Sequence, residues 1–312
     1  MEEQEYQEIG DLPKAQGLLY HYTDQKGLLG ILQSDCLWAT HYRFLNDATE
    51  RQGALDFFVS IDQMYSKEQD TSPSYWGALR ASLEKLAQLA DPYVVSFSEE
   101  REVSQFPGDR LSQWRGYALN RQGFSLGFEP EYLRKLAGKL TTDLGLATLL
   151  LPCAYDDEIK AEIVRDILQD HAALFKRISL ERITMSQPKT ERIIDDPAWR
   201  SIFRELETSF LNYSSQFKHE GFKEENEWRL VLYVLDGASR LDSIEFRDGP
   251  FGRTPFIKLP IGLKEPDSPL RRIVVGPSQN KEQIVFGLRL EFVKMGIHGV
   301  DVVPSQIPYR NW

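Results

Sequence analysis

The feature that most constrains the fold is a short β-forming run, Leu19–Thr23, followed at once by an apolar-periodic run from Leu28 to Leu32. Aromatic and β-branched residues favour a strand, and apolar residues at three- and four-residue spacing favour a helix. His21 therefore lies near a strand-to-helix junction, where its ring can face a ligand. The alternative is a partly buried strand residue whose ring bonds a backbone carbonyl, the commoner situation for a lone histidine.

Similar strand and helix patterns follow along most of the chain. Strands are predicted at Cys36–Thr40, Tyr93–Ser98, Gly123–Phe128, Leu149–Tyr155, Trp228–Val234, Arg272–Val275 and Val300–Val303, with helices at 130–138 and 280–295. A right-handed crossover through the last helix would make the two final strands parallel neighbours. The pattern predicts one α+β domain over residues 15–312.

Two segments differ from this pattern. Residues 1–14 are acidic and polar and close with Leu12 and Pro13, which predicts a flexible lead-in. Residues 156–217 carry two helical faces of apolar residues, which predicts a helical pair. This pair either packs on the sheet or is an insertion that receives a partner. The width of its apolar stripes favours packing.

Composition excludes several classes of function. The net charge of −10 provides no overall field that draws the chain onto DNA, RNA or anionic lipid, although a local basic groove stays open. No stretch approaches the roughly 20 apolar residues of a membrane helix, so no membrane association is expected. The N-terminus lacks the charged and apolar regions of a signal peptide, and a cytoplasmic location is expected.

The spacing of the cysteines and histidines predicts no metal site. Cys36 and Cys153 stand apart without a Cys-x-x-Cys partner, which predicts reduced core thiols. The five histidines show no paired ligand spacing on a helix. We therefore expect no metal cofactor.

Two acidic residues at a strand entrance can carry chemistry. Glu225 and Glu227 are two positions apart, and side chains alternate along a strand, so both are expected on one face. Paired carboxylates can stabilise a developing cation or orient a sugar hydroxyl, as cleavage of a glycosidic bond requires. The alternative is a solvated acidic edge in which Glu227 pairs with Arg229.

A second constellation combines Trp114, Arg115 and Tyr117. The arginine can clamp an anion through two parallel hydrogen bonds, and the aromatic rings can support a base. The alternative is an arginine stacked on a core tryptophan.

Five segments, in this order, resemble the bacterial domain-of-unknown-function family 2971 over about residues 18–235. They are Leu19–Thr23, Leu37–Asp47, Ser96–Ser98, Leu111–Ala118 and Glu225–Arg229. More remotely, the order of a His-Tyr-Thr strand, a helix, a Ser-Phe-Ser strand and a late glutamate strand resembles the ADP-ribosyltransferase fold. That fold includes the RNA 2′-phosphotransferases and a branch of DNA-modifying toxins.

The resemblance to the ADP-ribosyltransferase fold implies a split, partly antiparallel sheet decorated by helices, and NAD as the substrate. His21 would bind the adenosine ribose, and Thr23 with its backbone would hold the nicotinamide amide. Glu227 or Glu225 would be catalytic, stabilising oxocarbenium character as nicotinamide leaves.

An aromatic ring usually stacks on nicotinamide in such enzymes, and Phe97 or Tyr42 would take that place. Arg43 and Arg115 would be candidates for the pyrophosphate. All candidate nucleotide-binding residues are His21, Tyr22, Thr23, Tyr42, Arg43, Ser96, Phe97, Ser98, Trp114, Arg115 and Tyr117.

The resemblance thus implies NAD-dependent ADP-ribosyl transfer to a protein or nucleic-acid acceptor, in a bacterial toxin or phage-defence effector. Two alternatives stay open. One is a glycohydrolase that cleaves NAD or a related nucleotide without an acceptor. The other is a non-catalytic module that senses or binds a nucleotide, in which the glutamates cap a sheet edge.

Overall fold

The computed structural model shows a mixed α/β protein built on a large mixed sheet. It describes residues 14–45, 53–54, 56–57, 60, 92–100, 106–117, 122–144, 147–167, 169, 209–210, 213–234, 242–249, 252–266 and 268–308. Nearly all of the predicted lead-in and most of the predicted helical pair lie outside these residues. Helical backbone at 157–167 belongs to the start of that pair.

Within the described residues the sheet has ten strands, and eight of them follow the order β10-β9-β4-β1-β3-β2-β8-β7. Strand β6 pairs with β3 and with β5. The bounds are β1 Leu19–Asp24, β2 Cys36–His41, β3 Tyr93–Glu99, β4 Gly123–Phe128, β5 Ala147–Pro152, β6 Glu227–Tyr233, β7 Ile244–Gly249, β8 Gly252–Pro260, β9 Leu270–Val275 and β10 Asp301–Pro304.

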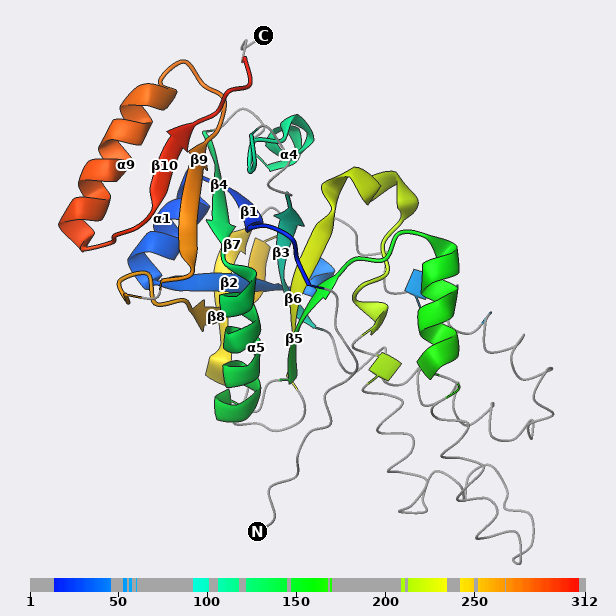
Figure 1. Ribbon diagram of the computed structural model, residues 1–312. Coiled ribbons are helices and arrows are strands. Elements are labelled where there is room, and N and C mark those ends of the chain that lie inside the picture. Colours follow the sequence, from blue (N-terminus) through cyan, green and yellow to red (C-terminus); the bar gives the residue numbers. More distant parts are fainter. Residues whose placement is uncertain are drawn as a thin grey trace, which may run out of the picture.

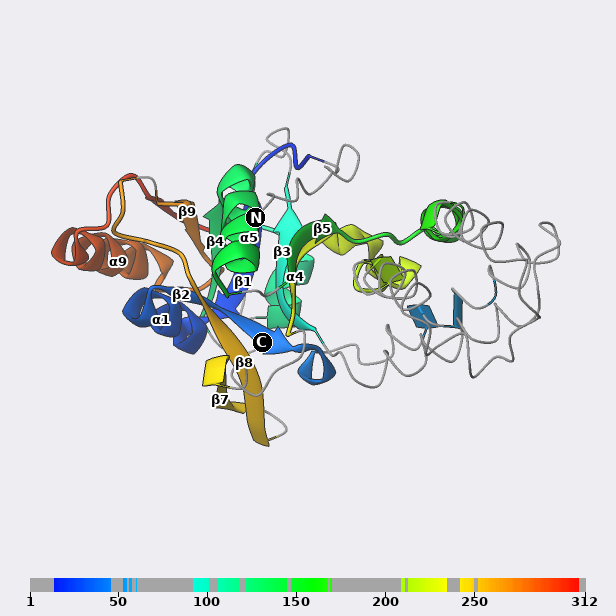
Figure 2. The same cartoon turned by 90° about the horizontal axis from the view of Figure 1, so that it is seen from below.

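Helices cover both faces of the sheet. The bounds are α1 Gln25–Ser34, α4 Leu111–Tyr117, α5 Pro130–Leu144 and α9 Lys281–Met295. Side chains of α1, α5 and α9 join Leu19 in the main hydrophobic core, whereas Trp114 of α4 packs with Tyr20 in a second cluster. Because successive strand residues face opposite sides, the two clusters lie on opposite faces of β1. Figure 1 shows α9 beside β9 and β10, and both views show α1 next to α9 (Figure 1, Figure 2).

The sheet divides at β3. One edge of β3 pairs with β6 from Tyr93 to Ser98. On the other edge β1 pairs only at the C-terminal end of β3, through Leu19 and Tyr20, and β2 pairs only at its N-terminal end. Strands β1 and β2 therefore diverge from each other, and Figure 1 shows β2 running across the direction of β4 and β9.

Most predicted elements are present with small shifts of their ends. The strand predicted at Gly123–Phe128 is β4, and the predicted parallel pair is confirmed as β9 and β10. The helix predicted at 130–138 extends to Leu144. The hairpin of β7 and β8 was not predicted, and it extends the sheet beyond β2.

No helix within the described ranges is both long and apolar enough to cross a membrane.

Candidate functional site

A cleft of about 840 Å³ lies where β1 and β2 diverge beside β3. It also receives side chains from α4, β6, β7 and the 3₁₀ helix η2 (Glu220–Glu225). The predicted site residues that line it are His21, Tyr22, Thr23, Ser96, Phe97, Ser98, Tyr117, Glu225 and Glu227. Segments far apart in the sequence therefore meet at one cavity.

His21 lines the cleft and is also anchored to the sheet. Its Nδ1 lies 3.0 Å from the carbonyl oxygen of Ser96. Burial lowers the pKa of His21, the Ser96 hydrogen bond opposes this shift, and the charge of Arg247 adds to it. The ring is therefore neutral at pH 7. Because a carbonyl can only accept, Nδ1 carries the proton and Nε2 is left as an acceptor.

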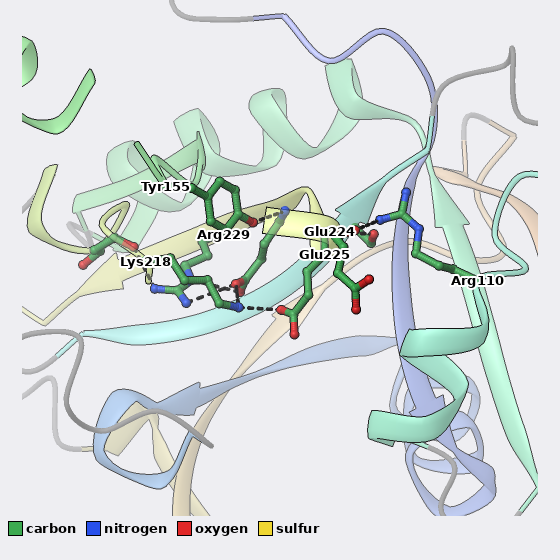
Figure 3. A network of polar contacts seen from close by, with 9 residues as sticks. Arg110, Tyr155, Lys218, Glu224, Glu225 and Arg229 are labelled. Carbon is green, nitrogen blue, oxygen red and sulfur yellow. Dashed lines mark hydrogen bonds and ion pairs between the residues drawn. The ribbon is translucent and has the colours of Figure 1, made fainter. Parts of the chain in front are cut away.

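A buried ionic network of cleft-lining side chains joins Glu227 and Glu225 to Arg229 and Lys218. Figure 3 shows Lys218, Arg229 and Glu225 within it. Arg229 donates from Nε to Glu227 Oε1 at 2.9 Å and from Nη2 to Oε2 at 3.1 Å. Lys218 Nζ donates to Glu227 Oε2 and to Glu225 Oε2, each at 2.5 Å. The predicted alternative pairing of Glu227 with Arg229 is therefore present. It is buried rather than solvated, because the Glu227 side chain is only 6 % exposed.

The network shifts the pKa of Glu227 and of Lys218 in opposite directions. Burial alone would raise the pKa of Glu227, but Arg229 and Lys218 lower it to about 2. Burial alone would lower the pKa of Lys218, but Glu227 and Glu225 raise it above its ordinary value. Glu227 and Lys218 thus both stay ionised at pH 7.

Glu225 reaches this network by a turn rather than by strand alternation. It ends η2, Asn226 takes a left-handed conformation with φ 44°, and β6 begins only at Glu227. The prediction that both glutamates lie along one strand was therefore wrong, although both contact Lys218. The turn is fixed by Ser98 Oγ, which donates to the Glu225 carbonyl at 2.6 Å, and by Asn226 Nδ2, which donates to the Glu99 carbonyl at 2.9 Å.

Four predicted residues do not line the cleft. Tyr42 is buried in the 3₁₀ helix η1 (Tyr42–Phe44), and Arg43 beside it is exposed. Trp114 is buried, with its ring 4.9 Å from that of Tyr22 and its Nε1 donating to Asp109 at 2.8 Å. Arg115 is exposed.

Among the aromatic candidates, Phe97 and Tyr117 differ in accessibility. Phe97 is only 2 % exposed and belongs to the main hydrophobic core, with its ring 6.0 Å from that of His21. Tyr117 is exposed and lines the cleft near the glutamates. Desolvation, Glu227 and Glu225 raise the pKa of Tyr117 to about 12, so its hydroxyl keeps its proton. Tyr117 is therefore the more accessible ring.

Sequence reasoning missed two cations of the cleft, Lys218 and Arg247. Arg247 lies on β7, where the alternation of Ile244 and Phe246 was the available signal for a strand. Lys218 has no motif around it, and only the fold brings it to Glu227.

No group of three or more histidine, cysteine or carboxylate side chains in the described part of the chain is placed to hold a metal ion.

Gly27 supports the position of Thr23. A Cβ at Gly27 would lie 1.9 Å from Thr23 Oγ1, so Gly27→Ala is expected to displace Thr23 and to lower the free energy of unfolding by about 1–3 kcal/mol. A Cβ added at Gly138 of α5 would have no described atom within 4 Å. Gly138→Ala is expected to stabilise by about 0.5–1 kcal/mol. Denaturant unfolding measures both, and equal stability of the two variants would contradict this packing.

Comparison with known proteins gives a match to one family model, over part of the chain. Residues 113–230 match the family model described as Protein of unknown function (DUF2971). The matched region runs from α4 into β6 and contains Tyr117, Lys218, Glu225, Glu227 and Arg229. No curated protein and no solved structure matches the chain. The match therefore supports the resemblance to this family for the part of the chain that brings Glu225 and Glu227 to the cleft.

Proposed function

We propose that the cleft binds NAD and that the protein transfers the ADP-ribosyl group of NAD to a macromolecular acceptor. One observation carries the proposal. His21 and Thr23 of β1 line the same cleft as Glu225 and Glu227, which is the combination that resemblance to the ADP-ribosyltransferase fold requires. A volume of about 840 Å³ suits a ligand of dinucleotide size.

The proposed step exchanges one bond to the ribosyl carbon. The bond from this carbon to the nicotinamide nitrogen breaks, and nicotinamide leaves with the electron pair. A nucleophilic oxygen or nitrogen of the acceptor then forms the new bond and loses its proton. Because positive charge develops on the ribosyl group as nicotinamide leaves, a fixed carboxylate beside it lowers the barrier.

Glu225 is the carboxylate that we assign to this charge. Its side chain is 23 % exposed, and its ion pair in the described structure is with Lys218. The Glu227 carboxylate is 6 % exposed and accepts hydrogen bonds from both Arg229 and Lys218. Its oxygens are therefore less available to a ligand hydroxyl. We assign Glu227 the role of positioning Lys218, which in turn holds Glu225.

The remaining roles follow from hydrogen-bonding capacity and access. His21 presents Nε2 as an acceptor, which suits a ribose hydroxyl. Tyr117 offers an exposed ring near Glu225, which suits the flat face of nicotinamide. The resemblance to the toxin branch extends the proposal to a bacterial toxin or phage-defence effector that acts in the cytoplasm.

NAD labelled in its adenylate part tests the proposal directly. Incubation of the protein with this substrate and bacterial extract is expected to release nicotinamide and to leave label on protein or nucleic acid. If label is found only in free ADP-ribose, the protein hydrolyses NAD and does not transfer the ADP-ribosyl group. No release of nicotinamide would contradict catalysis and leave a nucleotide-binding module. Arg115→Gln, at an exposed arginine that does not line the cleft, is the matched control and should behave as wild type.

A further inference from the structure

We infer that Arg247 and Thr40 form an anion-binding subsite in the cleft and that this subsite takes a phosphate group of the ligand. The choice of phosphate rests on the proposed nucleotide substrate. The subsite itself rests on the geometry and charge around Arg247.

The subsite lies away from the glutamates. Along β3, Thr40 of β2 is in register with Val94, and Glu227 of β6 is in register with Ser98. These two positions on β3 are about 13 Å apart at the rise of a strand. The cleft therefore has Arg247 and Thr40 towards one end and the carboxylates towards the other. A ligand that carries an anionic group and a ribosyl group that becomes positive would therefore bind with the anionic group at Arg247 and the ribosyl group at the carboxylates.

Arg247 is held in a defined orientation. Its guanidinium carbon lies 5.3 Å from the ring centre of Trp38 and 5.7 Å from that of Phe256. Its Nη2 donates to Thr40 Oγ1 at 2.7 Å. Because a guanidinium has five N–H donors, this bond leaves others that can reach a ligand in the cleft. A fixed, planar fork of donors is the geometry that binds phosphate oxygens best.

Arg247 makes no direct ion pair with a described carboxylate. No described carboxylate lies within 4.0 Å of it, whereas Lys218 and Arg229 are both paired with Glu227. Asp24 acts on Arg247 from farther away, and its carboxylate caps α1 by accepting from the Gly27 amide at 2.9 Å. Burial lowers the pKa of Arg247. A half-buried cation without a directly paired carboxylate is costly, and an anionic ligand in contact with it would lower that cost.

The two arginines that the sequence suggested for a pyrophosphate do not share these properties. Arg43 and Arg115 are exposed, and neither lines the cleft. Arg247 combines orientation, partial burial and a place in the cavity. It is therefore the residue that distinguishes a phosphorylated ligand from a nucleoside.

Calorimetric titration tests the subsite with three probes: ADP-ribose, inorganic pyrophosphate and adenosine. Wild-type protein is expected to bind ADP-ribose and pyrophosphate. In Arg247→Gln the dissociation constant for ADP-ribose should rise about 10- to 100-fold, the range expected for losing one charge-assisted hydrogen bond. The affinity for adenosine should not change. Arg115→Gln is the control, and Arg247→Lys should retain part of the affinity.

Each failure has a separate meaning. An Arg247→Gln protein that binds ADP-ribose as tightly as wild type would overturn the subsite, as would a wild-type protein that binds neither phosphate probe. If the phosphate probes bind through Arg247 but NAD is not turned over, the subsite stands and the proposed function fails. If Arg247→Gln turns over NAD with an unchanged KM, the subsite fails and the proposed function stands. Thermal unfolding of each variant confirms that it is folded.

Discussion

Glu225→Gln is expected to lower kcat for NAD by about a hundred- to a thousandfold, the usual effect of removing a fixed group that stabilises transition-state charge. The amide keeps the size of the side chain but removes the negative charge that we propose to act on the ribosyl carbon. KM should change little, because the interaction becomes strong only in the transition state. Nicotinamide release over a range of NAD concentrations measures both quantities.

Glu224→Gln is the matched control for this prediction. Glu224 is the exposed neighbour of Glu225, and its side chain does not line the cleft. Its backbone carbonyl accepts a hydrogen bond from Arg110, which Glu224→Gln would leave in place (Figure 3). The control should therefore retain wild-type turnover. Full activity in Glu225→Gln, or equal losses in both variants, would contradict the role of Glu225.

Strands with strong local signals could be predicted from the sequence. Continuous β-forming runs such as Tyr93–Ser98 and the alternating run Gly123–Phe128 coincide with β3 and β4. These strands form the inner part of the sheet, where the local preference of the residues for β-structure and their burial both favour a strand. The grouping of β1, β3 and the Glu227 strand around one cavity was implied by the order of the motifs.

Side-chain direction was harder to predict. Trp114 and Arg115 are consecutive in α4, so they point to different sides of a helix, one buried and the other exposed. Glu225 and Glu227 were expected to share a strand face, but the left-handed turn at Asn226 intervenes. Both outcomes depend on backbone geometry that residue spacing does not specify.

The cations of the cleft depend on tertiary structure. Lys218 precedes β6, and it reaches both glutamates because η2 folds back on the strand. Arg247 belongs to a hairpin that contains Pro255, and proline weakens a strand prediction. That hairpin pairs with β2 through β8, so a late segment of the chain meets an early one.

Glu227→Gln is expected to affect folding most strongly, because it leaves two buried cations short of a counter-charge. Removing one partner of a buried ion pair costs about 3–5 kcal/mol of unfolding free energy. Chemical denaturation at pH 7 measures this loss. Glu131→Gln, at a 64 % exposed carboxylate on α5, should change stability far less. Equal losses in the two variants would contradict the strength of the network.

Acid unfolding separates the charge of Glu227 from its packing. Its pKa is lowered from an ordinary value of 4.5 to about 2 in the folded protein, so the unfolded chain takes up this proton first as the pH falls. The stabilisation from Glu227 is therefore complete above about pH 5 and is lost between about pH 5 and pH 2, an effect on the order of 3 kcal/mol. The wild type and Glu131→Gln should lose this stability across that window, and Glu227→Gln should show a flatter dependence because its amide does not titrate. An unchanged acid dependence in Glu227→Gln would mean that Arg229 and Lys218 do not hold the Glu227 carboxylate ionised.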